Sequence, residues 1–237
     1  MTAETTALAL LSYDEREALE RLLPRVPLAR FDRVFAIDPG STDGTLEVYA
    51  RHGIAVHIQA ARGRGNAFLL AQEIAGTDRI VFFSTDGNEH PADLPRMLAL
   101  LDAGNDLVIA GRFLQAGAGS DDSDDPLRLR KLGNIVYSAV VRALWRSGVR
   151  DSINGYRAMR VDAMRRMRLD APLHEIELQS TIRAAKLGLR IAEFPTREQP
   201  RLGGVRKASA GTFTLGVRIG WFLLREIAIG RRFTTEG

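Results

Sequence analysis

The stretch from Ser84 to His90 carries the side chains best suited to bind a metal ion. It reads Ser-Thr-Asp-Gly-Asn-Glu-His. Asp86, Asn88 and Glu89 offer two carboxylates and an amide, which are hard oxygen ligands of the kind that hold Mg²⁺ or Mn²⁺ beside a phosphate. The alternative is a polar turn that ends a strand, with Pro91 opening a helix. These residues alone leave both interpretations open.

A buried strand is predicted to position this stretch. The segment 80–83 is a short, continuous apolar run, which is typical of a strand covered on both faces in a parallel sheet. In open parallel sheets, ligands bind just beyond the carboxyl ends of the strands. We therefore expect Asp86 to lie at a ligand-binding edge.

Further apolar runs alternate with amphipathic segments along the chain. Strands are predicted at 7–11, 34–37, 54–58, 106–110 and 190–194, and helices lie between them and over 129–145 and 174–187. This alternation predicts a doubly wound, parallel α/β sheet flanked by helices. Four of the strands end in polar loops, so we expect these loops to meet in one crevice. Asp14 is predicted to cap the helix after the first strand.

The end of the chain predicts an amphipathic helix over 213–229. Val217, Trp221 and Leu224 recur at helical spacing, with arginines between them. This helix has three open roles: packing on the domain, pairing with a second subunit in a homo-oligomer, or lying in a membrane interface. We expect residues 1–211 to form one domain, with 212–237 as a helix and tail that belong to it or serve as an interface element. The small and acidic segment 115–125 predicts a loop.

Composition narrows the classes of function. The 237 residues carry a formal net charge of +4, and arginine greatly outnumbers lysine. Because arginine binds phosphates and carboxylates through a planar fork, we expect anionic substrates or an anionic membrane surface as partners, and no nucleic acid. The lack of cysteine excludes disulfides and thiolate chemistry. No signal-peptide pattern and no run of about 20 apolar residues is present, so we expect a cytoplasmic protein. The basic, amphipathic helix over 213–229 would allow peripheral contact with the inner face of the membrane.

Taken in order, the polar loops resemble the motifs of glycosyltransferase family 2, and within it the polyprenyl-phosphate (dolichol-phosphate) sugar synthases. The resemblance extends from Ala7 to about Lys207. The matching segments are Ser12-Tyr-Asp-Glu15, Asp38-Pro-Gly-Ser-Thr-Asp-Gly-Thr45, Arg62-Gly-Arg-Gly-Asn-Ala67, Ser84-Thr-Asp86, Gly111-Arg112, Asp151-Ser-Ile-Asn-Gly-Tyr-Arg157, Glu193-Phe-Pro195 and Gly204-Val-Arg-Lys207. Each motif is weak alone, but their joint order is a strong signal.

The resemblance implies a GT-A fold, which is a Rossmann-like α/β domain with a mainly parallel sheet. It implies that a sugar moves with inversion from a GDP- or UDP-linked donor, assisted by Mg²⁺ or Mn²⁺, to a lipid phosphate or a small soluble acceptor. A phosphate acceptor is already ionised, whereas a hydroxyl acceptor needs a carboxylate base, for which Asp151 is the candidate. The alternative is a non-catalytic relative that binds nucleotide sugars or scaffolds a membrane glycosylation complex.

The resemblance also assigns roles to single residues. The catalytic candidates are Asp86, Asp151 and Arg112, and the metal ligands are Asp86 and Asn88. The nucleotide-sugar site would comprise Tyr13, Glu15, Asp38, Arg62, Ser84, Thr85 and Asp86, and the acceptor and diphosphate would meet Arg112, Arg130, Arg201 and Lys207. Two positions depart from the family pattern, since Pro39 and Ser84 stand where the family has aspartates. We therefore expect the metal site to depend on Asp86, Asn88 and the phosphates of the donor.

Overall fold

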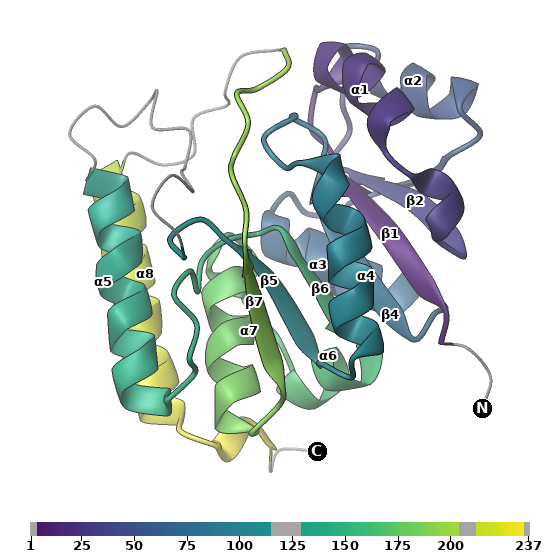
Figure 1. Ribbon diagram of the computed structural model, residues 1–237. Helices are drawn as coiled ribbons and strands as arrows, with labels where there is room; N and C mark the ends of the chain where they lie inside the picture. The colour runs from purple at the N-terminus through teal and green to yellow at the C-terminus, as the bar shows by residue number, and fades with distance from the viewer. Residues whose placement is uncertain (1–3, 115–128, 204–211, 235–237) are drawn as a thin grey trace.

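A mostly parallel sheet forms the centre of the protein (Figure 1). The computed structural model describes residues 4–114, 129–203 and 212–234, so the predicted loop at 115–125 and Lys207 lie outside the described residues. Its seven described strands have the order β3-β2-β1-β4-β6-β5-β7. They are β1 (Thr6–Leu11), β2 (Arg33–Asp38), β3 (Ala55–Ile58), β4 (Arg79–Ser84), β5 (Leu107–Gly111), β6 (Arg157–Arg160) and β7 (Ile191–Pro195). The predicted α/β class is confirmed.

Strand β6 is the exception to the parallel arrangement, and the sequence analysis did not predict it. It pairs antiparallel with both β4 and β5. Its sequence is Arg-Ala-Met-Arg, so it lacks the continuous apolar run by which the other buried strands are recognised. Arg157 is nevertheless fully buried, because its guanidinium donates hydrogen bonds to the carbonyl oxygen of Glu177 at 2.7 Å and to Ser180 Oγ at 2.6 Å.

Helices cover both faces of the sheet. They are α1 (Arg16–Leu22), α2 (Thr45–Arg51), α3 (Arg64–Ile74), α4 (Leu94–Asp102), α5 (Leu129–Trp145), α6 (Val161–Met167), α7 (Glu175–Lys186) and α8 (Thr212–Ile229), with 3₁₀ turns η1 (Leu23–Arg25), η2 (Leu28–Arg30), η3 (Pro91–Asp93) and η4 (Arg232–Thr234). Successive residues of a strand point to opposite faces. Leu8 and Leu10 of β1 accordingly join a core with α1, α2 and α4, whereas Ala7 and Ala9 join a core with α3, α6 and α7.

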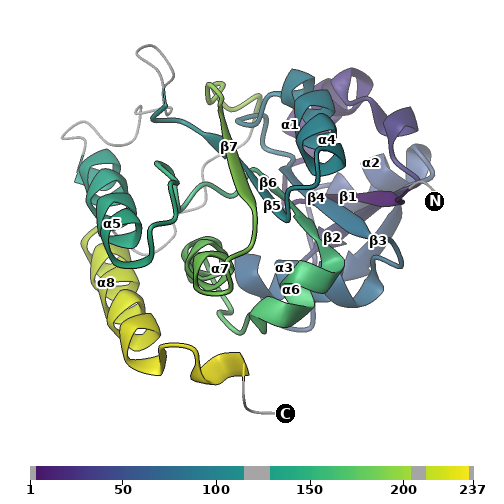
Figure 2. The same ribbon diagram turned by 60° about the horizontal axis from the view of Figure 1, so that its bottom comes forward.

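Helices α5 and α8 form an additional layer outside α7 (Figures 1 and 2). They pack on α7 and on each other through a separate apolar cluster that includes Val141, Ile182, Ile219 and Leu223. In the described part of the chain, no helix is both long and apolar enough to cross a membrane.

Candidate functional site

The loops after β1, β2 and β4 meet at one edge of the sheet, as the sequence predicted. These strands are neighbours and parallel, so their carboxyl ends lie together. Hydrogen bonds join the loops directly: Ser41 Oγ accepts from the backbone N–H of Asp14 at 2.7 Å, and Thr85 Oγ1 donates to the carbonyl oxygen of Leu11 at 3.1 Å. The edge is therefore one connected structure.

Asp38 holds the second of these loops together from inside. Its side chain is fully buried, and it accepts hydrogen bonds from the backbone N–H groups of Gly40 at 2.8 Å and Ser41 at 2.6 Å. Ser12 Oγ also donates to it, at 3.1 Å. This is the turn-capping arrangement that aspartate favours. A direct contact of Asp38 with the nucleotide stays a prediction.

The predicted helix cap at Asp14 is wrong. Helix α1 has no side-chain cap, and Asp14 adopts a positive φ of 47°. Its carboxylate instead accepts a hydrogen bond from the backbone N–H of Thr42 at 2.8 Å. The polar loop after β2 thus binds the side chain that was expected to cap α1. A pattern of residues local to the helix cannot reveal a contact with a loop from another part of the chain.

Tyr13 and Arg62, both assigned to the nucleotide, lie against each other. Arg62 Nη1 donates to the Tyr13 hydroxyl at 2.7 Å, and the guanidinium carbon lies 4.7 Å from the ring centroid. A cation over an aromatic face is an attractive contact. The pair brings a positive charge and a ring from separate loops to the same edge.

Arg201 joins the two acidic residues of the site. Its Nη1 lies 3.1 Å from Asp86 Oδ2, and its Nη2 lies 2.5 Å from Glu15 Oε1. The backbone of this segment also contacts the loop after β4, because the N–H of Leu202 donates to the carbonyl oxygen of Asp86 at 3.1 Å. Arg201 Nε is buried and has no hydrogen-bond partner among the described residues. This arginine therefore retains an unused donor beside two carboxylates.

Gly87 allows this close approach. Its φ is +91°, a conformation that favours glycine. A Cβ atom built there would lie 2.5 Å from Cγ of Leu202. Any larger residue would push the segment that carries Arg201 away from Asp86.

Asp86 and Asn88 fit a divalent cation that is shared with a ligand. The backbone N–H of Asn88 donates to Asp86 Oδ1 at 3.1 Å, which ties the two residues together. Asn88 Oδ1 is buried without a hydrogen-bond partner among the described residues. The described residues hold no group of three or more histidine, cysteine or acidic side chains suited to a metal. The remaining oxygen ligands would come from phosphates, in line with the preference of Mg²⁺.

Glu89, the second carboxylate of this stretch, turns away from Asp86 and Asn88. It turns back to β4 and accepts from the backbone N–H of Ser84 at 2.6 Å and from Ser84 Oγ at 3.0 Å. Burial raises the pKa of Glu89 to about 7, against the opposing effect of Arg64. Glu89 thus supplies a carboxyl group beside Ser84, the position where the family motif has an aspartate.

Arg64 belongs to the candidate site, which the sequence did not indicate. It lies at the start of α3, donates to Ser84 Oγ at 3.0 Å and pairs with Glu177 at 2.5 Å. It also lies 3.7 Å from Glu89. The signal in the sequence was the second arginine of Arg62-Gly-Arg64, but only the fold shows which arginine turns inward.

Arg112 is fixed at the end of β5 by Asp151. Nε lies 2.7 Å from Asp151 Oδ2, and Nη2 lies 3.0 Å from Oδ1, so the contact is bidentate. Burial alone would lower the pKa of Arg112, but Asp151 raises it above the ordinary value, so the side chain stays charged. Asp151 is fully buried, with both oxygens engaged. This arrangement argues against the general-base role that a hydroxyl acceptor would require.

Glu193, from the Glu-Phe-Pro motif of the sequence, has a structural role. Its carboxylate accepts from the backbone N–H groups of Arg150 at 2.7 Å and Asp151 at 2.8 Å. It thereby positions Asp151, which in turn positions Arg112. Of the other predicted residues, Thr85 is fully buried, and Arg130 belongs to α5.

Comparisons with known proteins identify the family of the chain. The family model for Glycosyl transferase family 2 matches residues 10–168, and the chain belongs to that family. Polyprenol monophosphomannose synthase of Mycolicibacterium smegmatis is 30% identical, over 87% of this chain and 82% of its own. Glycosyltransferase AglJ of Haloferax volcanii is 28% identical, over 86% of this chain and 66% of its own.

A solved structure shows the same fold. Glucosyl-3-phosphoglycerate synthase of Mycobacterium tuberculosis, in complex with Mn²⁺, UDP and glucosyl-3-phosphoglycerate, superposes with a TM-score of 0.70 at 22% identity, covering 94% of this chain and 79% of that one. The predicted GT-A-like fold and the membership of glycosyltransferase family 2 are confirmed. The protein is therefore a glycosyltransferase that takes its sugar from a nucleotide sugar.

Proposed function

We propose that this protein is an inverting glycosyltransferase that moves a sugar from a GDP- or UDP-linked donor to a polyprenyl phosphate. One observation carries the choice of a phosphate acceptor. Three carboxylates of the candidate site are held by arginines, since Glu15 and Asp86 pair with Arg201 and Asp151 pairs with Arg112. Glu89, whose pKa is raised, is buried and turned to Ser84. A carboxylate whose oxygens are held in this way is poorly placed to take a proton from a hydroxyl acceptor. A phosphate that is already ionised needs no base to become a nucleophile.

The donor site is supported by the cluster around Arg201. Asp86 and Asn88 would hold Mg²⁺ or Mn²⁺, which would stabilise the charge on the departing diphosphate. Arg201 is held at this edge by Glu15 and Asp86, and its Nε, which has no hydrogen-bond partner among the described residues, can donate to a phosphate oxygen. The protein thus presents a positive charge where negative charge develops in the transition state.

Arg112 is the proposed contact for the acceptor phosphate. Asp151 fixes Nε and Nη2, whereas Nη1 lies 3.4 Å from Glu198 Oε1. A guanidinium held in this way is preorganised and loses little entropy on binding a phosphate. Arg130 and Lys207 are proposed to serve the same acceptor. Two relatives support a lipid phosphate as the acceptor: polyprenol monophosphomannose synthase and undecaprenyl-phosphate mannosyltransferase.

Matched acceptors test this proposal. The purified protein, with Mn²⁺ and either GDP-mannose or UDP-glucose, would be given a detergent-solubilised polyprenyl phosphate, the corresponding polyprenol, or 3-phosphoglycerate. We expect release of nucleoside diphosphate and sugar transfer with the polyprenyl phosphate alone. Transfer to the polyprenol would contradict the phosphate nucleophile, and transfer to 3-phosphoglycerate would contradict the lipid acceptor. No release with any of the three would favour the non-catalytic alternative.

A further inference from the structure

Helices α5 and α8 carry most of the large apolar side chains that the protein exposes. Among the described residues these side chains are Leu132, Ile135, Val136 and Leu144 on α5, Val217, Trp221, Leu224 and Ile227 on α8, and Ile58 on β3. Trp221 is 74% exposed. Single exposed apolar residues are ordinary, but a cluster on two adjacent helices marks an interaction surface.

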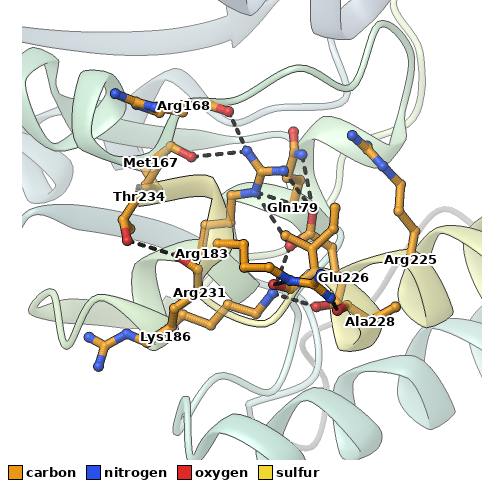
Figure 3. Close-up of polar contacts among 12 residues, drawn as sticks. Met167, Arg168, Gln179, Arg183, Lys186, Arg225, Glu226, Ala228, Arg231 and Thr234 are labelled. Atoms are coloured by element: carbon orange, nitrogen blue, oxygen red, sulfur yellow. Dashed lines mark hydrogen bonds and ion pairs between the residues drawn. The ribbon is translucent and has the colours of Figure 1, made fainter. Parts of the chain in front are cut away.

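Buried polar contacts fix the orientation of α8. Figure 3 shows Glu226 enclosed by side chains of α7. Its carboxylate lies 2.9 Å from both Arg183 Nη2 and Lys186 Nζ. Because a helix turns by about 100° per residue, Val217 and Trp221 lie on the opposite side of α8 from Glu226 and point outward.

The orientation of α5 is also fixed by its buried contacts. Val141 and Ser138 are fully buried on its inner side, whereas Leu132 and Val136 are exposed. The Tyr137 hydroxyl donates to the carbonyl oxygen of Gly216 at 2.7 Å and ties α5 to α8. Figures 1 and 2 show α5 and α8 side by side, so the exposed sides of the two helices adjoin. We call these outer residues of α5 and α8, listed above, the two-helix face.

The charges on these helices are almost all positive. Residues 129–146 include four basic and no acidic residues, and residues 212–232 include four basic residues and one acidic residue, Glu226, which is buried. Arg218 and Arg225 flank the apolar stripe of α8, where they pair with Glu175 and Asp170 of the domain. An apolar stripe flanked by arginines, with an exposed tryptophan, is the pattern of a helix that lies in a membrane interface.

We propose that the two-helix face docks on an anionic lipid bilayer, with Trp221 at the boundary between headgroups and acyl chains. A second copy of the chain is a poorer occupant, because a twofold contact would bring the same basic residues together. Helices α5 and α8 both begin at the end of the molecule where β5 and β7 end (Figure 1). Docking would therefore place the bilayer beside the proposed acceptor site. The inference rests on the proposed lipid acceptor for its biological sense, but vesicle binding is measured without the reaction, which serves only as a control.

Vesicle flotation tests this docking. The full chain would be mixed with vesicles of phosphatidylcholine alone or with about 30% phosphatidylglycerol added, at about 0.1 M and 0.5 M salt. We expect binding to the anionic vesicles at low salt and a marked loss at high salt. Trp221→Glu on α8 and Val136→Glu on α5 should each lower the bound fraction at least about fivefold. Ile58→Glu, on an exposed apolar residue away from the two-helix face, is the matched control and should bind as the wild type does.

Several outcomes would overturn the proposal. They are a wild-type protein that ignores anionic vesicles, Trp221→Glu and Val136→Glu variants that bind normally, and a dimer in light scattering that Trp221→Glu dissociates. Circular dichroism and melting temperature confirm that each variant is folded. Transfer to a detergent-solubilised polyprenyl phosphate should be the same for Trp221→Glu and the wild type. Failure of the docking proposal can thus be distinguished from failure of the proposed reaction.

Discussion

Two clusters of arginine and carboxylate in this protein have similar chemistry and different surroundings. In the α7–α8 cluster, Arg183 and Glu226 have side chains that are 3% and 0% exposed (Figure 3). In the site cluster, Arg201 and Asp86 have side chains that are 18% and 23% exposed. Both sets of ion pairs join segments that are far apart in the sequence. Their difference in burial determines what each can do.

The α7–α8 cluster consists of Arg183, Lys186 and Glu226, whose charged groups are hydrogen-bonded to one another and to backbone carbonyl oxygens. Besides Glu226, Arg183 donates to the carbonyl oxygen of Met167 at 3.1 Å, and Lys186 donates to the carbonyl oxygen of Glu226 at 2.6 Å. Burial would raise the pKa of Glu226, but Arg183 and Lys186 hold it below the ordinary value. No ligand can replace such a pair without exposing a buried charge. Its role is to hold α8 on α7.

The site cluster is incomplete by comparison. Arg201 Nε and Asn88 Oδ1 are buried without hydrogen-bond partners among the described residues. A donor and an acceptor in this condition cost free energy until a ligand satisfies them. Partial exposure also weakens the existing ion pairs, so a phosphate or a cation can exchange with them. The comparison suggests that burial and saturation, more than residue type, separate structural ion pairs from functional ones.

The largest effect is expected for Glu226→Ala. This change leaves Arg183 and Lys186 buried without their partner and should lower the free energy of unfolding by about 3–5 kcal/mol. Urea denaturation followed by circular dichroism measures it. The matched change at the site, Glu15→Ala, should cost less, about 1–3 kcal/mol, because Arg201 is partly exposed and keeps Asp86 as a partner. Equal losses for the two variants would remove the contrast between the clusters.

The next effect is expected for Arg201→Ala. It should lower kcat/KM about 100-fold by removing a positive charge from the diphosphate site, at little cost in melting temperature. Steady-state release of nucleoside diphosphate measures it. Arg197→Ala is the control, since Arg197 is exposed on the same segment, and we expect unchanged activity. If Arg201→Ala loses stability and activity together, Arg201 is structural, as Arg183 is.

The smallest effect concerns the pH dependence of stability at Glu89. Its pKa rises from an ordinary 4.5 to about 7 on folding, chiefly through burial. A carboxyl group of this kind stabilises the fold below pH 4.5, and its contribution is lost as the pH rises to about 7. The slope from one group cannot exceed about 1.4 kcal/mol per pH unit. Glu89→Gln cannot ionise and should flatten the melting temperature between pH 5 and 7 relative to the wild type. An unchanged slope would show that Glu89 does not titrate in this range.

The sequence predicted the fold well where local patterns decide it. The apolar runs of β1, β2, β4 and β5 were recognisable, and the polar loops after the first three of these strands meet as expected. Strand β6 was missed because Arg157 is buried through hydrogen bonds that come from α7, far along the chain. The antiparallel place of β6 between β4 and β5 follows from tertiary pairing, which the apolar pattern does not encode.

The candidate site was predictable in its residues and less so in its contacts. The resemblance placed Asp86, Glu15 and Arg201 at one site, and the structure brings them together. Nothing in the sequence showed that Glu89 and Arg64 would both form hydrogen bonds with Ser84. Likewise, the exposed residues of α5 and α8 form one surface only because the fold places the two helices side by side.

We propose that Asp86 lies where a divalent cation and a diphosphate meet. Calorimetric titration of Mn²⁺ into the protein, with and without UDP or GDP, tests this position. In the wild type we expect weak binding of Mn²⁺ alone and much tighter binding with the nucleotide, because each completes the coordination of the other. Asp86→Ala should abolish this mutual enhancement and leave the protein folded. Full enhancement in the Asp86→Ala protein would place the metal elsewhere and contradict the account.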